Sequence, residues 1–465
     1  MRTKTEYTSS AKFKSALVIF SFMGQVAWVV ENMYFNVFIY KMFNASAQDI
    51  SAMVIASAIT AAVTTLFIGC LADCVQKRKI FISLGYILWG FSILTFCLLR
   101  SDILEHFVTE KEGLSKVMAV SSLGISLVII MDCVMTFFGS SANDASFNAW
   151  LTDCGSDGNR GKIEGINSMM PLIAILAVFG SFMAFDLDQS SSWVKIYLII
   201  GSAVIIIGIL GFFLIEDHIN EKENSDLQRD STISAQCKSQ EKNEKLISRW
   251  AKSVVYSFRI SVIKQNPLLY FTCLAFALFG ISIQIFMPYL ILYYEKSLGM
   301  ANFVLVMAPA ILVAALVTSL YGKVFDKHGF EIAIISPIAM LTAGYILLYF
   351  FKNMPCVFIG SLLMMSGYLT GMAVFGAKLR EQIPQDKTGM FQGIRIIAQV
   401  LIPGIIGPAI GAAVLKNAQK IVNSDGTTSF LPNNNIFLAA LIAISVLVAF
   451  LVLQFLARKK RNKSN

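Results

Sequence analysis

Apolar stretches close to twenty residues long recur along the whole chain, and this feature limits the possible folds most strongly. A helix rises 1.5 Å per residue, so about 20 apolar residues cross the hydrocarbon core of a bilayer. The 465-residue chain is 56% hydrophobic and only 14% charged, which is too little polar surface to keep so many apolar helices in water. The sequence therefore predicts an all-α membrane protein.

The apolar stretches predict twelve transmembrane helices arranged as two six-helix bundles. The fourth stretch is too long for one straight crossing, so we expect an extramembrane extension or a break within it. The predicted spans are residues 15–40, 49–72, 79–99, 117–150, 163–185, 192–215, 268–294, 301–321, 330–351, 355–378, 390–414 and 434–457.

The polar segment between the two groups divides the chain into three parts. Residues 1–215 form the predicted N-terminal bundle, 216–267 a cytoplasmic linker, and 268–465 the C-terminal bundle. Near the end of the linker, Ile247, Trp250, Val254 and Phe258 share one helical face. This face is typical of an amphipathic helix on the membrane surface, and core packing explains the same pattern equally well.

The basic residues are distributed unevenly between the two sides of the predicted membrane. Of 38 Lys and Arg residues, 29 fall in the termini and even-numbered loops and 9 in the odd-numbered loops. Because basic residues are retained on the cytoplasmic side, we expect a multi-pass protein of the plasma membrane with both termini inside. The same distribution explains the net charge of +9 without nucleic acid as a partner.

The eight cysteines fall mostly in apolar segments, without C-x-x-C pairs or nearby histidines, which favours small core residues over disulfides or metal ligands. The three histidines lie in or beside loops, so a buried proton carrier must be a carboxylate. There is no nucleotide loop, metal cluster or nucleophile–base spacing. We therefore expect neither an enzyme nor a cofactor.

A short charged motif occurs twice. The first copy combines a glycine, an acid and a basic triplet in what we expect to be a loop between spans two and three: Gly69, Asp73, Lys77, Arg78 and Lys79. Its glycine and acid return 253 positions later as Gly322 and Asp326. Two copies in the same register indicate an internal duplication.

A second repeat supports the duplication. The segment 147–166 reappears 228 positions later as 375–394, with Phe, Ala and Leu retained and Glu164 matched by Gln392. We assign the nearby bases Arg160 and Arg395 to the same predicted gate as the first motif. Parallel repeats with a substrate site between them are typical of one class of transporter fold.

Polar residues inside apolar spans mark the candidate site, because a carboxylate at the centre of a bilayer costs about 2.5 to 3.5 kcal/mol on insertion scales. The alignment of the repeats places Asp144 inside span four, and Asp132 lies further out on the same helix face. In span one, Glu31 shares an arc of about 140° with a group of polar and aromatic residues. The other candidates for binding substrate or a proton are Gln25, Trp28, Asn32, Asn148, Gln284 and Gln399.

The structural alternatives to this site remain open at this point. Asp144 can simply cap the inner end of span four, and Glu31 can be a satisfied polar contact between helices. The candidate Asn and Gln side chains can likewise be satisfied polar contacts between helices.

The charged motif resembles the loop between the second and third helices of major facilitator superfamily transporters, G-x-L-x-D-[RK]-x-G-[RK]-[RK]. The resemblance implies that the two copies latch a cytoplasmic gate. This chain departs from the pattern at Cys74 and Gln76 in the first copy, and at Phe330 in the second.

A narrower resemblance concerns two helices. The segment 144–151 is similar to helix four of the glycoside-pentoside-hexuronide:cation symporters, and 24–31 is similar to helix one of the sucrose:proton carriers. The resemblance implies that the helix-four acid contributes to sugar and cation binding. Ala61 and Thr65 stand where melibiose-type carriers have paired acids, and Val26 where they have the helix-one acid. This favours a proton over sodium, carried by Glu31 or Asp144.

The expected function is secondary active transport of a small solute, a sugar or glycoside, by proton-coupled or other cation-coupled symport with alternating access. Proton-coupled efflux of amphipathic compounds is the alternative within the same fold. A membrane sensor is the alternative from another class, although the linker is too poor in apolar residues to indicate a folded domain. We expect a monomer in the lipid bilayer.

Overall fold

The computed structural model describes the chain except residues 1–7, 9, 76, 110–111, 155–159, 218–258, 301, 383–393, 424 and 465. For a few residues at helix ends, among them Asp73, Arg160 and Gly322, only the backbone is described. Most of the predicted linker therefore lies outside the described residues, and with it the predicted amphipathic face.

The N-terminal half begins with a span made of three helical segments in direct succession, α2, η1 and α3. Its remaining helices follow in order along the chain. The bounds are α2 Ala11–Val29, η1 Val30–Tyr34, α3 Phe35–Phe43, α4 Ala47–Val75, α5 Arg78–Thr95, η2 Phe96–Leu98, α6 Ser101–Leu104, η3 Glu105–Phe107, α7 Gly113–Gly139, η4 Ser140–Phe147, α8 Asn148–Cys154, α9 Arg160–Phe182 and α10 Ser190–Leu214.

The C-terminal half has a similar series of helices and one small antiparallel hairpin, in which Lys420 pairs with Phe430. The bounds are α13 Ile260–Gln265, α14 Pro267–Gln284, η5 Met287–Tyr289, α15 Leu290–Leu292, η6 Tyr293–Ser297, α16 Val304–Ala333, α17 Ile335–Phe350, α18 Met354–Gln382, η8 Ile397–Leu401, α20 Ile402–Leu415, β1 Lys420–Val422, β2 Thr428–Phe430 and α21 Asn435–Ser464.

These helices account for the predicted spans. Among the described residues, ten helices are long and apolar enough to cross a membrane, and a bent pair, Val324–Ala333 with Ile335–Phe350, supplies an eleventh. A shorter apolar helix, Met169–Phe182, lies where the fifth span is expected. The fourth span is one continuous helix of 42 residues, Gly113–Cys154, with the π-helical segment η4 inside it, so of the two expectations the structure shows a helix longer than one straight crossing and no break.

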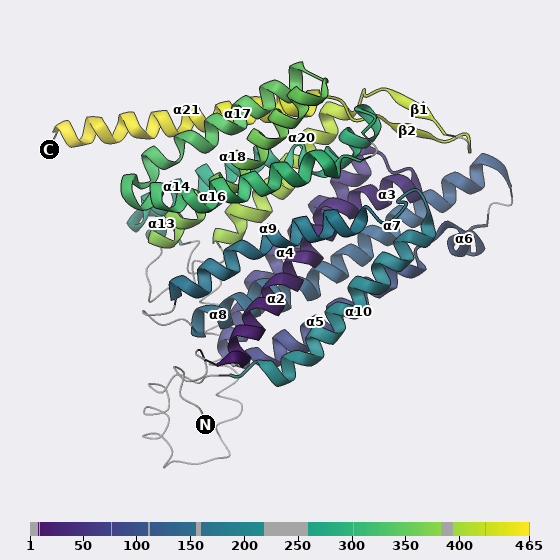
Figure 1. Ribbon diagram of the computed structural model, residues 1–465, viewed down its shortest axis with the longest axis horizontal. Helices are drawn as coiled ribbons and strands as arrows, with labels where there is room; N and C mark the ends of the chain where they lie inside the picture. The colour runs from purple at the N-terminus through teal and green to yellow at the C-terminus, as the bar shows by residue number, and fades with distance from the viewer. Residues whose placement is uncertain are drawn as a thin grey trace, which may run out of the picture.

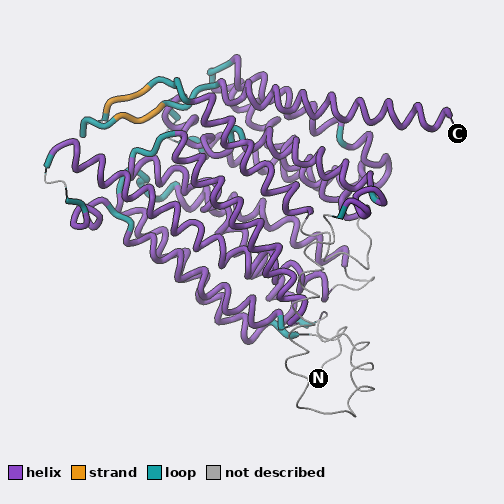
Figure 2. The backbone as a smooth tube through the Cα atoms, turned by 180° about the vertical axis from the view of Figure 1, so that it is seen from behind, coloured by secondary structure: helices purple, strands orange, loops and turns teal. Residues whose placement is uncertain are grey.

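The halves form two bundles that lie close together at one end and diverge toward the other (Figures 1 and 2). We call the end that carries β1 and β2 the hairpin end and the opposite end, where α2 begins and α21 ends, the terminus end. Between the halves, α4 packs on α20 and α9 packs on α16. A Cβ atom on Gly404 of α20 would lie 2.4 Å from Cβ of Ala58 on α4, so this contact requires a glycine.

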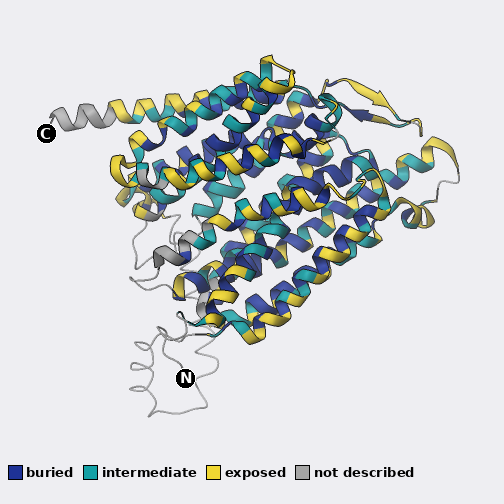
Figure 3. Ribbon diagram, in the orientation of Figure 1, coloured by how far each residue is buried: buried dark blue, intermediate teal, exposed yellow. Residues whose placement is uncertain are grey.

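Exposed residues lie along the outward faces of the bundles, and buried residues face the neighbouring helices (Figure 3). On α10 the exposed residues include Ile199, Ile206 and Phe213. Large apolar side chains on an outward face would be unfavourable in water and are what a helix needs against lipid.

Small residues allow close helix packing inside each half. Gly90 on α5 approaches Gly201 on α10, and Gly344 on α17 approaches Gly360 on α18. Lipid tails are as apolar as the helices, so close packing rather than the hydrophobic effect holds membrane helices together.

Replacing Gly208 with valine is expected to destabilise the N-terminal bundle, because a Cβ atom there would lie 2.7 Å from the Ile87 nitrogen and 2.9 Å from the Ser83 carbonyl oxygen. Overpacking of this kind costs about 1–3 kcal/mol. The thermal midpoint in detergent should fall, whereas Gly180→Ala, with nothing within 4 Å of the added atom, should leave it nearly unchanged. Equal midpoints for the two variants would contradict this assignment of close packing.

The structure corrects the prediction that the repeated charged motif forms a loop. Gly69 and Asp73 belong to the last turns of α4, and Lys77 directly precedes α5, which begins at Arg78. In the second copy the helix continues through Asp326 and breaks at Gly329, whose φ of 72° suits a residue without a side chain. The helices are longer than the apolar stretches because backbone hydrogen bonding continues into the polar region.

Candidate functional site

Glu31 lies where the first span departs from regular α-helix. The π-helical turn η1 adds a residue to the helical repeat, and such turns are frequent at functional sites. Glu31 is 6% exposed, and its Oε1 accepts hydrogen bonds from Ser57 Oγ at 2.5 Å and from Thr136 Oγ1 at 2.8 Å. Three helices of the N-terminal half, the first span, α4 and α7, therefore fix this carboxyl group.

Asp132 is a second buried acid next to Glu31. It stands one turn before Thr136 on α7, is 2% exposed, and interacts electrostatically with Glu31. Within the described part of the chain, Glu31 Oε2 and Asp132 Oδ1 are buried and have no hydrogen-bond partner. Buried carboxyl oxygens without partners are costly, so this pair is suited to a proton or another cation that neutralises it.

Asp144 lies in η4, the π-helical segment of the fourth span. Its carboxylate accepts hydrogen bonds from Ser140 Oγ at 3.1 Å and Asn143 Nδ2 at 3.2 Å, and the Trp28 side chain provides a third. The helix continues beyond it through α8 to Cys154. Asp144 is therefore an internal residue of this span and does not cap its end.

Arg395 connects this acid to the other half of the molecule. It precedes η8 in the eleventh span, acts electrostatically on Asp144, and donates from Nε to Gln399 Oε1 at 3.3 Å. The sequence had suggested Arg395 as part of a cytoplasmic gate. The electrostatic interaction of Arg395 with Asp144 crosses between the two halves, and its role in a gate stays a prediction.

Trp28 is held in place by aromatic and glycine contacts. Its ring centroid lies 5.1 Å from that of Trp89, and Gly139 leaves room for both rings, because an added Cβ would lie 2.7 Å from Trp89 and 3.0 Å from Trp28. Gly24, one turn before Trp28, leaves room for the Asn143 amide in the same way. Tyr86 O–H lies 2.9 Å from Asn143 Oδ1 and 3.0 Å from the Phe20 carbonyl, and can donate to either.

The remaining predicted amides are less closely connected to the acids. Asn32 and Asn148 are exposed, and Asn32 donates to the Trp28 carbonyl at 2.8 Å. Gln25 is half-buried on α2, and Gln284 packs against Gly407 of α20. Gln399 accepts a hydrogen bond from Arg395, and Arg395 in turn interacts with Asp144.

Sequence reasoning missed Ser57 and Tyr86 as parts of the site. Ser57 is one of several hydroxyl residues in an apolar span, so no spacing distinguishes it from Thr60 or Thr64. Tyr86 reads as an ordinary aromatic residue of span three. Only the packing of α4 and α5 against the first and fourth spans brings them to the acids.

The predicted gate residues lie at the terminus end. Arg78 forms an ion pair with Asp153 at 2.9 Å, and the Lys79 amide donates to Asp217 at 2.8 Å. Asp326 is exposed, and the side chains of Asp73 and Arg160 lie outside the described residues. The ion pair Arg78–Asp153 joins residues of the N-terminal half, and Lys12–Glu216 joins that half to the first residue of the predicted linker.

Two bundles of membrane-length helices, with acids inside the N-terminal bundle and an arginine of the other bundle interacting with one of them, define a polytopic membrane transporter rather than an enzyme. The sequence also identifies the family of transporters to which the chain belongs. The chain matches the model of the Major Facilitator Superfamily over residues 16–408 and belongs to that family.

Solved structures with the same fold share little sequence with this chain. The nucleoside transporter NupG aligns at a TM-score of 0.63 with 13% identity, covering 95% of this chain and 99% of that one. A bacterial homologue of the lysosomal transporter Spinster, inward-facing and occupied, gives 0.64 and 14%, with coverages of 96% and 97%. A bacterial homologue of the iron transporter ferroportin, outward-facing, gives 0.60 and 12%, with coverages of 97% and 99%. No curated protein sequence matches.

Proposed function

We propose that this transporter carries a small hydroxylated solute, a sugar or a glycoside, in symport with protons. The observation that carries the proposal is Asp144, held in the fourth span beside the Trp28 indole and across from Arg395. A carboxylate accepts hydrogen bonds from hydroxyl groups, and a flat aromatic ring packs on the apolar face of a sugar. Nucleosides, which NupG is named for transporting, also carry a sugar, and this agrees with the proposal.

Protonation couples to substrate through the charge between Asp144 and Arg395. In a low-dielectric interior, an ionised Asp144 attracts Arg395 and keeps the two halves together at this point. A proton on Asp144 removes that attraction and leaves a hydroxyl donor for the substrate. Binding of solute and proton together then permits the halves to move, which is the basis of symport.

The membrane arrangement is part of the same proposal. We propose that the terminus end faces the cytoplasm and the hairpin end the outside, which the excess of basic residues in the termini and even-numbered loops supports, and that the protein is a monomer of the plasma membrane. The six-helix units 1–215 and 268–465, joined by the linker 216–267, are the two bodies that move.

The proposal is tested by the external pH of deenergised proteoliposomes after addition of single mono- and disaccharides. Alkalinisation on addition of one sugar, lost in Asp144→Asn, is the expected result. Asp102→Asn is the matched control, since Asp102 lies in an exposed ion pair with Arg100 at 2.7 Å and takes no part in the central cluster.

No alkalinisation with any sugar, from protein that is folded and monodisperse, would overturn sugar symport. The same vesicles then test the alternative, because proton-driven efflux of amphipathic dyes would assign this chain to the export branch.

A further inference from the structure

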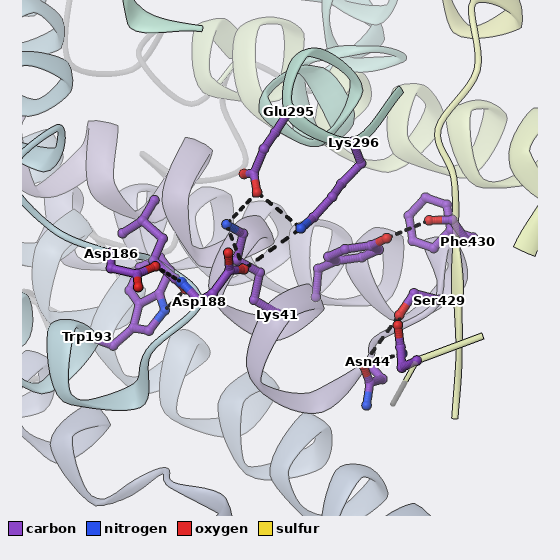
Figure 4. A network of polar contacts seen from close by, with 12 residues as sticks. Lys41, Asn44, Asp186, Asp188, Trp193, Glu295, Lys296, Ser429 and Phe430 are labelled. Atoms are coloured by element: carbon purple, nitrogen blue, oxygen red, sulfur yellow. Dashed lines mark hydrogen bonds and ion pairs between the residues drawn. The ribbon is translucent and has the colours of Figure 1, made fainter. Parts of the chain in front are cut away.

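At the hairpin end, a second charged cluster joins the two halves, beginning ten residues after Glu31 along the first span. It consists of two bases and two acids from three segments: Lys41 near the end of α3, Asp188 in the turn before α10, and Glu295 and Lys296 in η6. Figure 4 shows Lys41 between the two acids, with Lys296 reaching the same pair. We call these four residues the hairpin-end latch.

Lys41 is the centre of this cluster. Its side chain is only 5% exposed, and its Nζ lies 2.6 Å from Glu295 Oε1 and 3.1 Å from Asp188 Oδ1. Lys296 lies 3.2 Å from Glu295 and 3.8 Å from Asp188. The bonds Lys41–Glu295 and Lys296–Asp188 cross from one half to the other.

Burial decides which of these pairs matters. Asp188 is 65% exposed, and ion pairs at such positions contribute little because water competes for them. Glu295 is 14% exposed, so Lys41 and Glu295 are both largely withdrawn from water when the halves meet. If Lys41 is removed, Glu295 keeps only the more exposed Lys296 as a partner, and if Glu295 is removed, Lys41 keeps only the exposed Asp188, so the remaining buried charge is less well compensated.

Neutral contacts beside the latch also cross between the halves. Tyr40 O–H donates to the Phe430 carbonyl on β2 at 2.7 Å, and Tyr289 O–H donates to the Ala47 carbonyl at 2.9 Å. Asn423 donates to the Asn44 side chain at 3.1 Å. The hairpin is thus fixed to the end of the first span, next to Lys41.

We propose that the hairpin-end latch, with Lys41 as its central residue, closes this end of the transporter and must break before the end can open. The four charges sum to zero, so the closed cluster is electrostatically balanced, and opening returns all four groups to water. The latch lies outside the proposed substrate site and does not depend on the nature of the solute.

Titration of Asp188 is not expected to open the latch between pH 5 and pH 8. Partial burial alone would raise the pKa of Asp188, but Lys41 and Lys296 facing it outweigh this and lower the pKa below its usual 3.8. A carboxylate with a lowered pKa stabilises the closed form above that value and loses this contribution only as the pH falls through it. Opening near pH 6 would mean that a group other than Asp188 controls the latch.

The test measures the distance between spin labels at His106 and Lys352, in full-length protein without its eight native cysteines, in lipid nanodiscs. Both positions are exposed. They lie at the hairpin end of different halves, since Ser101 contacts the Met42 carbonyl and Asn434, just after the hairpin, contacts the Tyr349 carbonyl. Lys41→Met should increase the ratio of open to closed molecules about tenfold, and Lys41→Arg should leave it near wild type.

The variant that best tests the latch is the double substitution of Lys41 and Glu295, because it restores the charge balance of the cluster. Lys41→Met leaves the cluster with one excess negative charge and Glu295→Met with one excess positive charge, whereas the double variant is neutral again. The double variant should therefore open less than the sum of the two single shifts predicts. Lys116→Met is the control, because Lys116 pairs with Glu105 at 2.7 Å at the same end but within one half.

Three results would overturn the proposal. They are an unchanged distance distribution in monodisperse Lys41→Met protein, additive shifts in the double variant, and an equal shift in Lys116→Met.

Discussion

Asparagine in place of Asp144 is expected to abolish sugar-induced proton influx and to weaken equilibrium sugar binding about tenfold to a hundredfold. The estimate follows from a hydrogen bond to a charged group, which is worth about 1.5–3 kcal/mol. The asparagine amide keeps an oxygen that can accept from Ser140 or Asn143, so the turn η4 should fold as before. It removes both the titratable group and the charge facing Arg395.

The measurement is alkalinisation together with sugar binding by isothermal titration. Asp144 supplies both a titratable group and the charge opposite Arg395, and a second substitution at Arg395 separates these two roles. In Arg395→Gln alone, the carboxylate loses the opposite charge, while in the double variant no charge is left uncompensated. The double variant should therefore be better folded than Arg395→Gln. If Asp144→Asn transports sugar with protons at the wild-type rate, the coupling model is wrong.

Glutamine in place of Glu31 is expected to reduce proton-driven sugar uptake at least about tenfold while leaving sugar counterflow largely intact. The glutamine oxygen can still accept from Ser57 and Thr136, so the contacts between the three helices are retained. Only the ionisable group beside Asp132 is lost. Counterflow exchanges solute without net proton movement, so it reports folding and binding separately from coupling.

The matched control for Glu31→Gln is Ser57→Ala, which removes one hydrogen-bond donor and keeps the carboxyl group. We expect that control to retain uptake driven by a proton gradient. Loss of counterflow and uptake together in Glu31→Gln would assign Glu31 to a structural contact between helices, the alternative that the sequence left open.

Much of the site was visible in the sequence because carboxylates are rare in apolar spans. Glu31, Asp132 and Asp144 were identified on that ground, and Trp28 by its helical spacing to Glu31. The structure groups these four residues in the N-terminal half. Asn32 and Asn148 lie on exposed positions, and their role in binding stays a prediction.

The gate was the least accurate prediction. The repeated motif continues α4 and α16 rather than forming loops, and the sequence did not indicate the interaction of Arg395 with Asp144. The hairpin-end latch had no sequence signal, because its residues carry ordinary loop charges and Lys41 and Glu295 are 254 positions apart.

By itself, the sequence determined that the chain is an all-α membrane protein, that its halves are repeats, and that a few acids lie at membrane depth. These properties follow from the hydrophobicity and spacing of residues along the chain, because the apolar core of the bilayer selects apolar helices of a fixed length. Only the tertiary structure decided which polar groups meet. The π-helical turns at Glu31 and Asp144, the hydroxyls of Ser57 and Thr136, and the approach of Arg395 depend on helix rotation and close packing between distant segments. Helix rotation and packing distance are set by contacts between helices, so they cannot be predicted from the sequence of one helix alone.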